Sequence, residues 1–574
     1  MTELPRQRVY CVLLVFALFL GSVGTRLVSF QVLRGADLSR EADAEHALDE
    51  PVPARRGVIY DSTGQVLATT IPAYRVFAIE DQITDPEALA RALAAPLAMS
   101  PDAIAALLKD GKDKHLDWVQ LKRHLTPTAS DQVRALGLKG IVLDSEPVRV
   151  YPNGDFAAQV LGFANWDMQG AYGVEGYYDA LIGGKPGHLL AERDVNGNII
   201  SVAQNRYDAP VDGDDAVLTI DAGLQRQAEQ ELAAAVKAQN AAGGTAIVMD
   251  VQTGAILAMA SLPSFDPNTF AQYDLSAFTN PAISEIYEPG STFKLLTMAI
   301  GIDTGKITPE TVHDDAPGYI LVKDGDQTFK ITNANQAVYG RETMTQVLER
   351  SANLGAAFVS QRVGPRDFYA KLREFGLGQP TGVDLQGEEQ GIVHWDDAPD
   401  WRPVNLITNS FGQGIGVTPL QMITAIAAVV NGGKLMRPYV VKELRHNGQV
   451  VKRNDPRVVR QVISPETSRQ VVGMMTDVVD KVSFPYVGVP GYAVGAKSGT
   501  AQVPAPNGGY LGDDVTIGSE VGIGPSENPR FAVLVVIDRP KLDPWGAHVA
   551  GPPVRDLLLD VFTEYAVPPT RREP

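Results

Sequence analysis

Apolar side chains dominate the start of the chain. Residues 9–24 read VYCVLLVFALFLGSVG, and the apolar pattern continues past Arg26 to Phe30. A stretch of this length can form a helix that crosses a bilayer, because the long side chain of Arg26 reaches the polar interface. We therefore predict a transmembrane anchor over residues 9–30.

The flanking residues favour a retained anchor over a cleaved signal peptide. No convincing A-x-A cleavage site follows the apolar run, and the next residues, RLVSFQVLRG, continue with the spacing of an amphipathic helix. Arg6 and Arg8 precede the run, and positive charge beside a membrane helix marks the cytoplasmic side. Residues 1–8 are predicted to be a cytoplasmic tail, with everything after about residue 30 outside the cytoplasm.

Strand and helix patterns alternate between the anchor and residue 210. Residues 56–61 and 66–68 are expected to form two strands joined by a short turn, and 141–151 a further extended segment. Leu and Ala recur at helical spacing within 86–139, which predicts short helices there. No set of residues in this half has the pattern of a catalytic site. Residues 31–210 are therefore predicted to form a supporting pedestal domain.

A second set of strands and helices follows the pedestal. The pattern predicts a strand at 216–220, a helix from Asp221, and a hairpin made of TAIVMDV and AILAMAS. The apolar run 531–537 predicts a last strand. Strands at both ends with helices between them indicate one mixed α/β domain over 211–564, whose sheet closes with its final strands. A polar tail, 565–574, follows this domain.

Length and charge narrow the possible functions. At 574 residues the chain exceeds the size of a single core, so several domains are expected. Its 50 Lys and Arg against 68 Asp and Glu give a formal net charge of −18, which disfavours a nucleic-acid partner. The one cysteine, Cys11, excludes an intrachain disulfide, and the eight histidines lack a zinc-binding spacing. No metal ion or other cofactor is predicted.

The first candidate for catalysis is the pair Ser291 and Lys294. They belong to the sequence EPGSTFK at 288–294, which precedes the apolar stretch LLTMAIGI, so a helix is predicted to start near Ser291. Residues three apart on a helix share a face, and a lysine in apolar surroundings can act as the base for a serine nucleophile. Alone the pattern indicates little, because a helix-capping serine followed by a solvated lysine has it too.

The second candidate is the pair Ser351 and Asn353. They lie where the helix pattern TMTQVLER ends and the pattern LGAAFVSQ begins. A hydroxyl and a carboxamide two residues apart can face one cleft, the first to relay a proton and the second to bind a peptide amide. The same S-x-N pattern recurs at 526–528 beside two prolines, where we interpret it as a structural turn.

The third candidate is the sequence Lys497-Ser498-Gly499-Thr500, which follows the alternating run YAVGA on a predicted strand. The lysine charge and the two hydroxyls suit a terminal carboxylate, and Gly499 leaves room for a substrate backbone. A polar strand end has the same pattern when it stands alone. The order S-x-x-K, S-x-N, K-S-G makes coincidence a poor explanation of all three motifs.

In this order the motifs resemble those of penicillin-binding proteins, and the rest of the chain resembles the class B members of that family. The likeness includes RGVIYDSTGQVLA at 56–68, RVYP at 149–152 and GVE at 173–175 in the pedestal. It also includes LTID at 218–221 and FGQG at 411–414. The resemblance implies an α/β (α+β) fold: one transmembrane helix, an elongated pedestal, and a β-lactamase-like transpeptidase domain with a mainly antiparallel sheet flanked by helices.

The resemblance also implies a reaction, that of a serine-type peptidoglycan D,D-transpeptidase. Ser291 is expected to attack the penultimate D-alanine of a D-Ala-D-Ala stem peptide and form an acyl-enzyme, while Lys294 takes its proton. Ser351 and Lys497 are expected to pass a proton to the leaving D-alanine. β-Lactams mimic this substrate and are expected to acylate Ser291 as well.

The remaining motif residues are implied to bind the substrate. Asn353 is expected to bind a substrate amide, and Ser498 and Thr500 to hold the terminal carboxylate beside Gly499. The backbone N–H groups of Ser291 and Thr500 are expected to form the oxyanion hole.

The resemblance extends to location and partners. It places the protein in the cytoplasmic membrane of a bacterium, with the catalytic domain outside. No segment before residue 215 resembles a glycosyltransferase domain. Glycan polymerisation is therefore expected from a partner, a SEDS-family polymerase in the same membrane, alongside other membrane proteins of cell-wall synthesis. Whether the protein serves division or elongation stays open.

The sequence departs from the family pattern at two places. The strand pattern Ser-Phe-Val-Gly-Phe-Ala-Pro is here SEVGIGP at 519–525, and Ala-Ala-Pro is here AGP at 550–552. Neither departure is expected to touch the catalytic groups.

Two alternatives are compatible with the motifs. A D,D-carboxypeptidase or β-lactamase on the same fold differs only in the acceptor that resolves the acyl-enzyme, although the pedestal favours transfer. A non-catalytic β-lactam sensor or scaffold is the second alternative. The short N-terminal tail leaves a sensor without an output domain, and a scaffold has no need of the complete set of catalytic groups found here.

Overall fold

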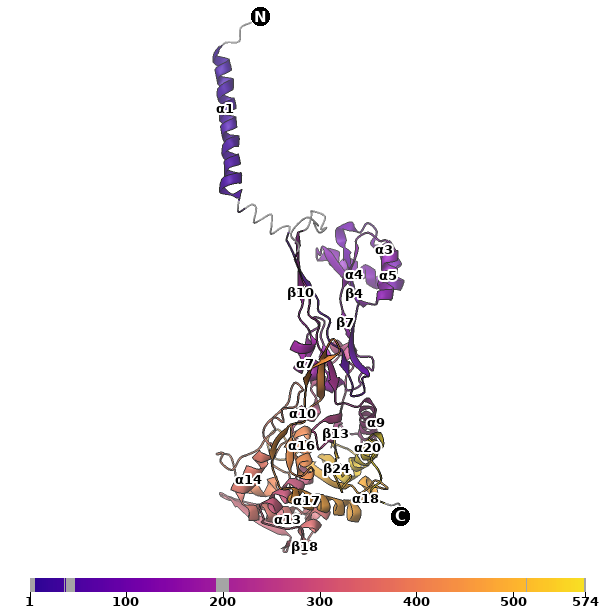
Figure 1. The fold of residues 1–574 in the computed structure, drawn as a ribbon, viewed down its shortest axis with the longest axis vertical. Coiled ribbons are helices and arrows are strands. Elements are labelled where there is room, and N and C mark those ends of the chain that lie inside the picture. Colours follow the sequence, from indigo (N-terminus) through magenta and orange to yellow (C-terminus); the bar gives the residue numbers. More distant parts are fainter. Residues whose placement is uncertain (1–5, 36, 38–46, 193–205, 513, 572–574) are drawn as a thin grey trace. The chain divides into compact units, whose positions relative to one another are not determined.

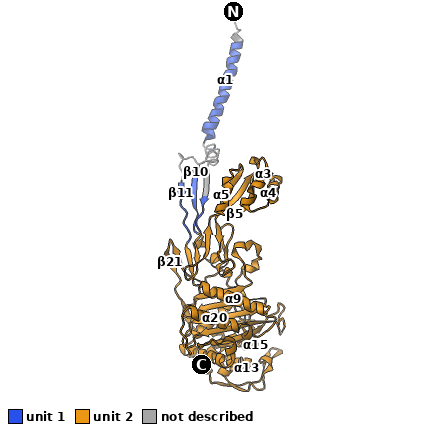
Figure 2. Ribbon diagram, turned by 90° about the vertical axis from the view of Figure 1, so that its right-hand side faces the viewer, with its two compact units in different colours: residues 1–55, 184–213 blue, residues 56–183, 214–574 orange. Residues whose placement is uncertain are grey.

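The computed structural model describes residues 6–35, 37, 47–192, 206–512 and 514–571. The start of the predicted tail, residues 1–5, and the last residues of the polar tail, 572–574, lie outside the described residues. The chain forms two compact units, one of residues 1–55 and 184–213 and the other of residues 56–183 and 214–574 (Figure 2).

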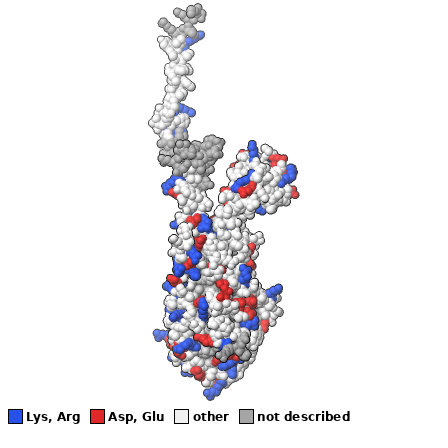
Figure 3. All heavy atoms as spheres, turned by 45° about the vertical axis from the view of Figure 1, so that its right-hand side comes forward, with Lys and Arg blue, Asp and Glu red and all other residues white. Residues whose placement is uncertain are grey.

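The first unit contains the apolar helix. Helix α1 (Arg6–Val28) continues into a π-helical turn, Ser29–Leu33. Its large apolar side chains are exposed, and the stretch Arg8–Leu33 is long and apolar enough to cross a membrane. Figure 3 shows this helix largely free of charged atoms, whereas acidic and basic groups are scattered over the second unit. The structure thus confirms a single continuous helix over the predicted anchor.

Three antiparallel strands complete the first unit (Figure 1). Strand β10 (Gly187–Glu192) pairs with β1 (Ala47–Val52) on one side and with β11 (Arg206–Asp208) on the other. Strands β1 and β10 are thus paired although more than a hundred residues of the second unit lie between them along the chain.

One sheet of the second unit joins strands from both sides of residue 210. Its order is β21-β20-β12-β2-β3-β7, and the pair β12–β2 is parallel while the other pairs are antiparallel. The strands are β2 (Ile59–Tyr60), β3 (Val66–Ile71), β7 (Val148–Val150), β12 (Asp215–Leu218), β20 (Val441–His446) and β21 (Gln449–Arg453). The predicted strands around 59, 66 and 216 are therefore confirmed, and the structure pairs them in one sheet, which the sequence did not predict.

A small α/β subdomain lies between β3 and β7. Strands β5 (Trp118–Leu125), β4 (Tyr74–Ile79) and β6 (Ile141–Ser145) form an antiparallel sheet in that order. Helices α3 (Pro86–Leu97), α4 (Pro101–Asp113) and α5 (Pro127–Ala135) accompany it. Each helix begins with a proline after a capping side chain, a combination that satisfies the first free N–H groups.

The prediction of helices throughout 86–139 is wrong at β5. The segment WVQLKRHL buries Val119, Leu121 and Leu125, and the first two show the two-residue period of a strand rather than helical spacing. The extended segment predicted at 141–151 is also divided, into β6 and β7. Pairing of β4 between β5 and β6 fixes both outcomes, and the sequence windows do not contain this long-range information.

The central sheet of the second unit has five antiparallel strands in the order β14-β13-β25-β24-β23. They are β13 (Gly243–Asp250), β14 (Ile256–Leu262), β23 (Gly495–Gln502), β24 (Thr516–Gly524) and β25 (Phe531–Asp538). Strand β25 pairs with β13 along its whole length, so the sheet closes with the last strands, as predicted. The hairpin β13–β14 is confirmed as well.

Helices cover both faces of the central sheet (Figure 1). Helix α9 (Ala222–Ala238), capped by Asp221, and α20 (Gly551–Glu564) pack together on one face. On the other face lies α16 (Pro419–Val430), whose residues are all buried. The further helices of this layer are α10 (Pro281–Ser284), α11 (Lys294–Asp303), α12 (Met344–Glu349), α13 (Asn353–Val363), α14 (Pro365–Glu374), α15 (Pro403–Asn409) and α17 (Pro465–Val478).

Short elements complete the second unit. Three antiparallel strand pairs are β15 (Val312–Asp314) with β18 (Arg341–Thr343), β16 (Tyr319–Asp324) with β17 (Gln327–Thr332), and β19 (Lys434–Met436) with β22 (Val458–Gln461). A fourth pair is β8 (Phe163–Ala164) with β9 (Gly170–Ala171), and the remaining short helices are α6 (Ala158–Leu161), α7 (Gly173–Tyr177), α8 (Asp179–Ile182), α18 (Phe484–Val487) and α19 (Gly546–Val549).

A buried ion network holds the strands and loops near β2 together. The side chain of Glu175 is fully buried and accepts hydrogen bonds from Arg56 Nε at 2.6 Å and Arg149 Nε at 2.7 Å. Tyr151 donates to the same carboxylate at 3.2 Å, and Arg149 also donates to Gly57 O at 2.7 Å. Burial alone raises the pKa of Glu175, but the two guanidinium groups outweigh it and lower the pKa. These residues belong to the RG, RVYP and GVE sequences, which the structure brings into contact.

Replacing Glu175 by glutamine should strongly destabilise the second unit, because two buried guanidinium groups lose their shared counter-ion. We expect Glu175→Gln to lower the free energy of unfolding by about 3–5 kcal/mol in urea titrations of the full chain. Glu466→Gln is the control, since Glu466 forms an exposed pair with Arg469 and should change stability by less than about 1 kcal/mol. Equal losses in the two variants would contradict the role of the network.

Candidate active site

Ser291 lies on a tight turn that begins a helix. Gly290–Phe293 form a single 3-10 turn, which continues directly into α11 at Lys294. Gly290 has a φ of +55° and donates its N–H to Gly412 O at 3.0 Å. A Cβ on Gly412 would come within 2.1 Å of Gly290 O, so only glycine allows this loop to pack against the turn. The sequence FGQG therefore supports the turn that carries Ser291.

Lys294 is completely buried beside Ser291. Its Nζ lies 3.0 Å from Ser291 Oγ, 2.5 Å from Ser351 O and 2.8 Å from Asn353 Oδ1. Ser351 Oγ is farther away, at 3.4 Å. The structure thus brings four of the predicted residues to one point, and the lysine amine is at its centre.

The surroundings of Lys294 favour its neutral form. Burial lowers its pKa well below the ordinary lysine value, and the positive charge of Lys497 lowers it further. The carboxylate of Glu342 on β18 acts in the opposite direction. The effect of burial is the largest of the three, so the lowered pKa gives Lys294 the electrostatic setting of a general base.

Ser351 occupies the predicted junction between α12 and α13, in a strained conformation. Its φ is +57°, in the left-handed region that side chains other than glycine rarely adopt. This conformation accompanies the short contact from Lys294 to Ser351 O. Strain of this kind is concentrated at functional sites because the surrounding structure must hold it in place.

Asn353 is the first residue of α13 and has both ends of its amide engaged. Its Oδ1 accepts from Lys294, and its Nδ2 donates to Thr332 O at 3.1 Å. The second S-x-N sequence, at 526–528, lies in a turn where Ser526 Oγ accepts from Thr476, as the structural interpretation predicted. The surroundings of the two copies therefore distinguish the one in the candidate active site from the one in a structural turn.

The third motif lies on β23, the edge strand of the central sheet. Ser498 and Thr500 line the cavity in front of Ser291, and Thr500 Oγ1 accepts from Gly546 N at 2.9 Å. Lys497 is buried, and its Nζ donates to Ser498 O at 2.8 Å. The structure shows no hydrogen bond between Lys497 and Ser351, although both are among the described residues.

Gly499 packs closely against the turn that carries Ser291. A Cβ at this position would come within 2.6 Å of Pro289 O and of Ser519 Oγ. On the face that a Cβ would occupy, Gly499 therefore packs against the protein's own backbone ahead of Ser291. Glycine is needed here so that β23 can pack against the turn of Ser291.

The departure at 519–525 lies beside the third motif in the central sheet. Glu520 on β24 stands opposite Ser498 in the register of the sheet. It is buried, and its charge raises the pKa of Lys497 against the effect of burial, which lowers that pKa to about 8. The sequence pattern did not indicate this, because only strand pairing makes residues 498 and 520 neighbours.

A cavity of about 770 Å³ opens in front of Ser291. Four of the predicted residues besides Ser291 line it: Ser351, Asn353, Ser498 and Thr500. Sequence reasoning missed other lining residues, including Tyr339, Arg350, Gln413 and Trp545. Gln413 belongs to the FGQG sequence, which was a usable signal, whereas Tyr339, Arg350 and Trp545 lie in no recognised motif. The cavity is large enough for an extended peptide segment.

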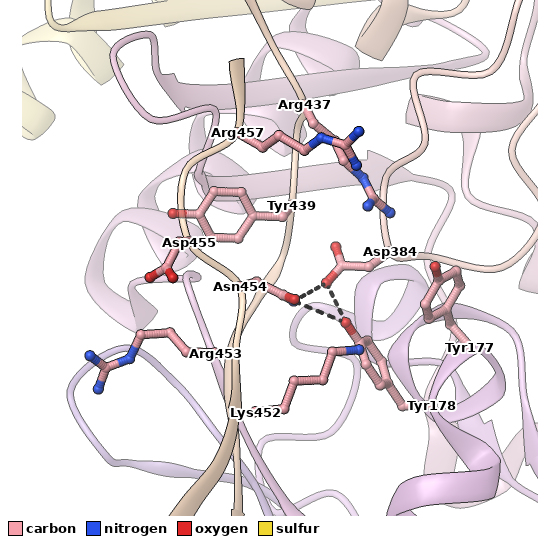
Figure 4. A pocket seen from close by; sticks show the side chains of 10 residues that line it. All are labelled: Tyr177, Tyr178, Asp384, Arg437, Tyr439, Lys452, Arg453, Asn454, Asp455 and Arg457. Carbon is pink, nitrogen blue, oxygen red and sulfur yellow. Dashed lines mark hydrogen bonds between the residues drawn. The ribbon is translucent and has the colours of Figure 1, made fainter. Parts of the chain in front are cut away.

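A smaller cavity, of about 320 Å³, lies elsewhere in the second unit. Its wall includes Tyr178, Asp384 and Asn454, which are joined by hydrogen bonds (Figure 4). Four basic residues also line it: Arg437, Lys452, Arg453 and Arg457. None of the motif residues borders this cavity, so the reactive groups gather at the larger one.

Two family models match the chain. The penicillin-binding protein transpeptidase domain matches residues 244–559, and the penicillin-binding protein dimerisation domain matches residues 51–218. The first match contains all residues of the three catalytic motifs, at 291–294, 351–353 and 497–500.

Relatives match over nearly the whole chain. "Stage V sporulation protein D" of Bacillus subtilis is 34% identical, over 99% of this chain and 87% of its own length. "Peptidoglycan D,D-transpeptidase FtsI" of Escherichia coli is 30% identical, over 96% of this chain and 89% of its own length. The crystal structure of penicillin-binding protein 3 of Mycobacterium tuberculosis in complex with aztreonam is similar, with a TM-score of 0.69 and 29% identity. That match covers 92% of this chain and 100% of the solved one.

Proposed function

The chain belongs to the class B penicillin-binding proteins, and on this premise we propose that it cross-links peptidoglycan as a serine D,D-transpeptidase with Ser291 as its nucleophile. The observation that carries the proposal is the 3.0 Å contact between Ser291 Oγ and the buried amine of Lys294. A serine hydroxyl becomes an effective nucleophile when a base of lowered pKa lies within hydrogen-bond distance.

The first half of the reaction forms an acyl-enzyme. Ser291 Oγ attacks the carbonyl carbon of the penultimate D-alanine while Lys294 Nζ takes the hydroxyl proton. The C–N bond to the terminal D-alanine breaks, and its amine takes up a proton through Lys294 and Ser351, which lie 3.4 Å apart at Nζ and Oγ. Lys497 supplies a positive charge beside this proton relay, which favours release of the proton to the leaving amine.

The second half transfers the acyl group to a neighbouring stem peptide. The incoming amine attacks the ester carbon, its proton passes to Lys294, and Ser291 Oγ leaves with a proton. The relatives named D,D-transpeptidase support transfer to an amine rather than to water. A β-lactam enters the same first half and leaves Ser291 acylated.

Different residues of the cavity wall bind different groups of the substrate. Ser498 and Thr500 face the cavity and hold the terminal carboxylate, with Lys497 behind them as the positive charge. Asn353 binds a backbone amide of the stem peptide. The N–H groups of Ser291 and Thr500 stabilise the oxyanion that forms during both halves of the reaction.

The apolar helix supports a membrane location. We infer that residues 9–30 span the bacterial cytoplasmic membrane once, with Arg6 and Arg8 inside and the catalytic unit outside. Protease added outside spheroplasts should digest the catalytic unit, and a mature chain that begins near residue 30 would contradict the anchor. Glycan strands come from a SEDS-family polymerase in the same membrane. Chemical cross-linking in membranes tests this partnership. If no cross-linked complex with such a polymerase forms, the partnership is excluded.

Ser291→Ala should abolish covalent labelling by fluorescent penicillin, because the variant lacks the attacking hydroxyl. Labelled membranes are resolved on denaturing gels, and the thermal unfolding of the variant should match that of the wild type. Ser526→Ala, in the turn that repeats the S-x-N pattern, is the control and should label normally. A folded Ser291→Ala protein that still labels would refute the assignment of the nucleophile.

The two lysines should respond differently to arginine. Lys294 must become neutral, and arginine stays charged at any working pH, so Lys294→Arg should slow acylation by roughly 10²–10⁴-fold. Lys497 acts through its charge, so Lys497→Arg should raise the barrier by only about 1–3 kcal/mol. The measurement is the second-order rate constant of β-lactam acylation for each variant. If Lys294→Arg reacts as fast as Lys497→Arg or faster, Lys294 is not the base.

A further inference from the structure

One charged side chain lines the cavity in front of Ser291. Among the residues that the structure describes, the cavity wall is made of hydroxyl, amide, aromatic and apolar groups, and Arg350 is its single ionic side chain. The two motif lysines, Lys294 and Lys497, are buried beneath this wall. A positive charge that faces an otherwise uncharged cavity attracts an anionic group of the ligand.

The guanidinium of Arg350 has hydrogen-bond donors available for a ligand. Its one ion pair is with Glu342 on β18, at 3.7 Å between Nη1 and Oε2, which is longer than a hydrogen bond. It donates no hydrogen bond to another residue that the structure describes. A guanidinium carries five N–H groups in a planar fork, so Arg350 is able to bind a carboxylate through two parallel hydrogen bonds.

Two neighbours hold this guanidinium in place. Glu342 lies behind it with no exposed side-chain surface, whereas 38% of the Arg350 side chain is exposed. Cζ of Arg350 also lies 5.4 Å from the centre of the Tyr339 ring, and Tyr339 is itself part of the cavity wall. Burial raises the pKa of Glu342 to about 7, so this carboxylate only partly neutralises the arginine near that pH. Contacts that fix a side chain in advance reduce the entropy lost on binding.

Arg350 lies on the part of the wall assigned to the acyl portion of the substrate. It is the C-terminal cap of α12 and directly precedes Ser351. Asn353, the proposed ligand of a stem-peptide amide, is three residues further along the same wall. The proposed site of the terminal carboxylate is on a different element, at Ser498 and Thr500 of β23. The anion that meets Arg350 is therefore a second one, upstream of the bond that breaks.

We propose that Arg350 is a specificity-determining residue: its guanidinium binds a second carboxylate, on the side chain of the residue before D-Ala-D-Ala, so that acidic stem peptides are selected over amidated ones. That residue is the nearest one to the acylated D-alanine whose side chain is long enough to carry such a group. A carboxamide of the same shape has no charge and binds a guanidinium more weakly. The inference rests on the proposed acylation of Ser291.

The first test compares two β-lactams that differ by one carboxylate. Carbenicillin has a carboxylate on the acyl side chain where benzylpenicillin has a hydrogen atom. The measurement is the ratio of their second-order acylation rate constants in the full-length protein, because effects common to both compounds cancel in the ratio. Arg350→Gln should lower the carbenicillin-to-benzylpenicillin ratio by roughly 10-fold or more. Arg350→Lys keeps the charge but lacks the planar fork, so it should lower the ratio less.

Arg362→Gln is the matched control. Arg362 is exposed on α13, and its Cζ lies 5.2 Å from the centre of the Phe358 ring, but it does not line the cavity. The substitution removes the same charge and a similar ring contact, so the ratio should stay at the wild-type value.

The second test uses two donor pentapeptides that end in D-Ala-D-Ala. They differ only in the side chain of the third residue, which carries either a carboxylate or the corresponding carboxamide. The wild type should release D-alanine from the acidic peptide with a KM lower by roughly 10-fold. Arg350→Gln should lose this preference. The wild-type comparison stands by itself if Arg350→Gln does not fold.

Two results would overturn the proposal. One is a folded Arg350→Gln protein whose inhibitor ratio equals that of Arg362→Gln. The other is a wild-type protein that binds the amidated peptide as well as the acidic one. Failure of the proposed function is distinguishable, because labelling would then persist in Ser291→Ala, whereas failure of the present inference leaves Ser291 as the nucleophile.

Discussion

The contact between Ser291 and the buried amine of Lys294 is the interaction on which the active site depends. Burial raises the free energy of the protonated form of an amine that has no exposed surface. Among the described residues, no carboxylate lies within ion-pair distance of Lys294 to offset this. Its partners are instead a hydroxyl, a backbone carbonyl and an amide oxygen. The same burial that removes water from the lysine therefore makes it a base for the serine.

Much of the fold serves to hold this contact in place. Glycine at 290 and 412 lets the FGQG loop pack against the nucleophile turn, and glycine at 499 lets β23 pack against it from the other side. Ser351 accepts a left-handed backbone so that its carbonyl reaches Lys294. The central sheet, with helices on both faces, makes these close approaches rigid. Catalytic geometry here is a consequence of backbone packing more than of any single side chain.

Sequence patterns predicted most features that depend on residues close together along the chain. The cap at Asp221, the hairpin β13–β14, the closing strand β25 and the three motifs all follow from windows of a few residues. Strand β5 is not predicted, because it lies between two segments with helical spacing, α4 and α5. Its own two-residue spacing is too short to stand out from theirs. The pairing of Glu520 with Ser498 does not follow from such windows, because their separation along the chain says nothing of the strand register. The packing of Gly499 against Pro289 is likewise a long-range contact that no such window contains.

Direct titration of Lys294 tests the central claim most closely. The full-length protein, with its lysines isotopically labelled at Cε and Nζ, can be followed by NMR in detergent micelles, with Lys294→Arg identifying the signal. The account predicts that Lys294 loses its proton well below the pKa of the exposed lysines and that its resting form near neutral pH includes the free amine. A Lys294 signal that stays in the ammonium form up to the titration of the exposed lysines would contradict it.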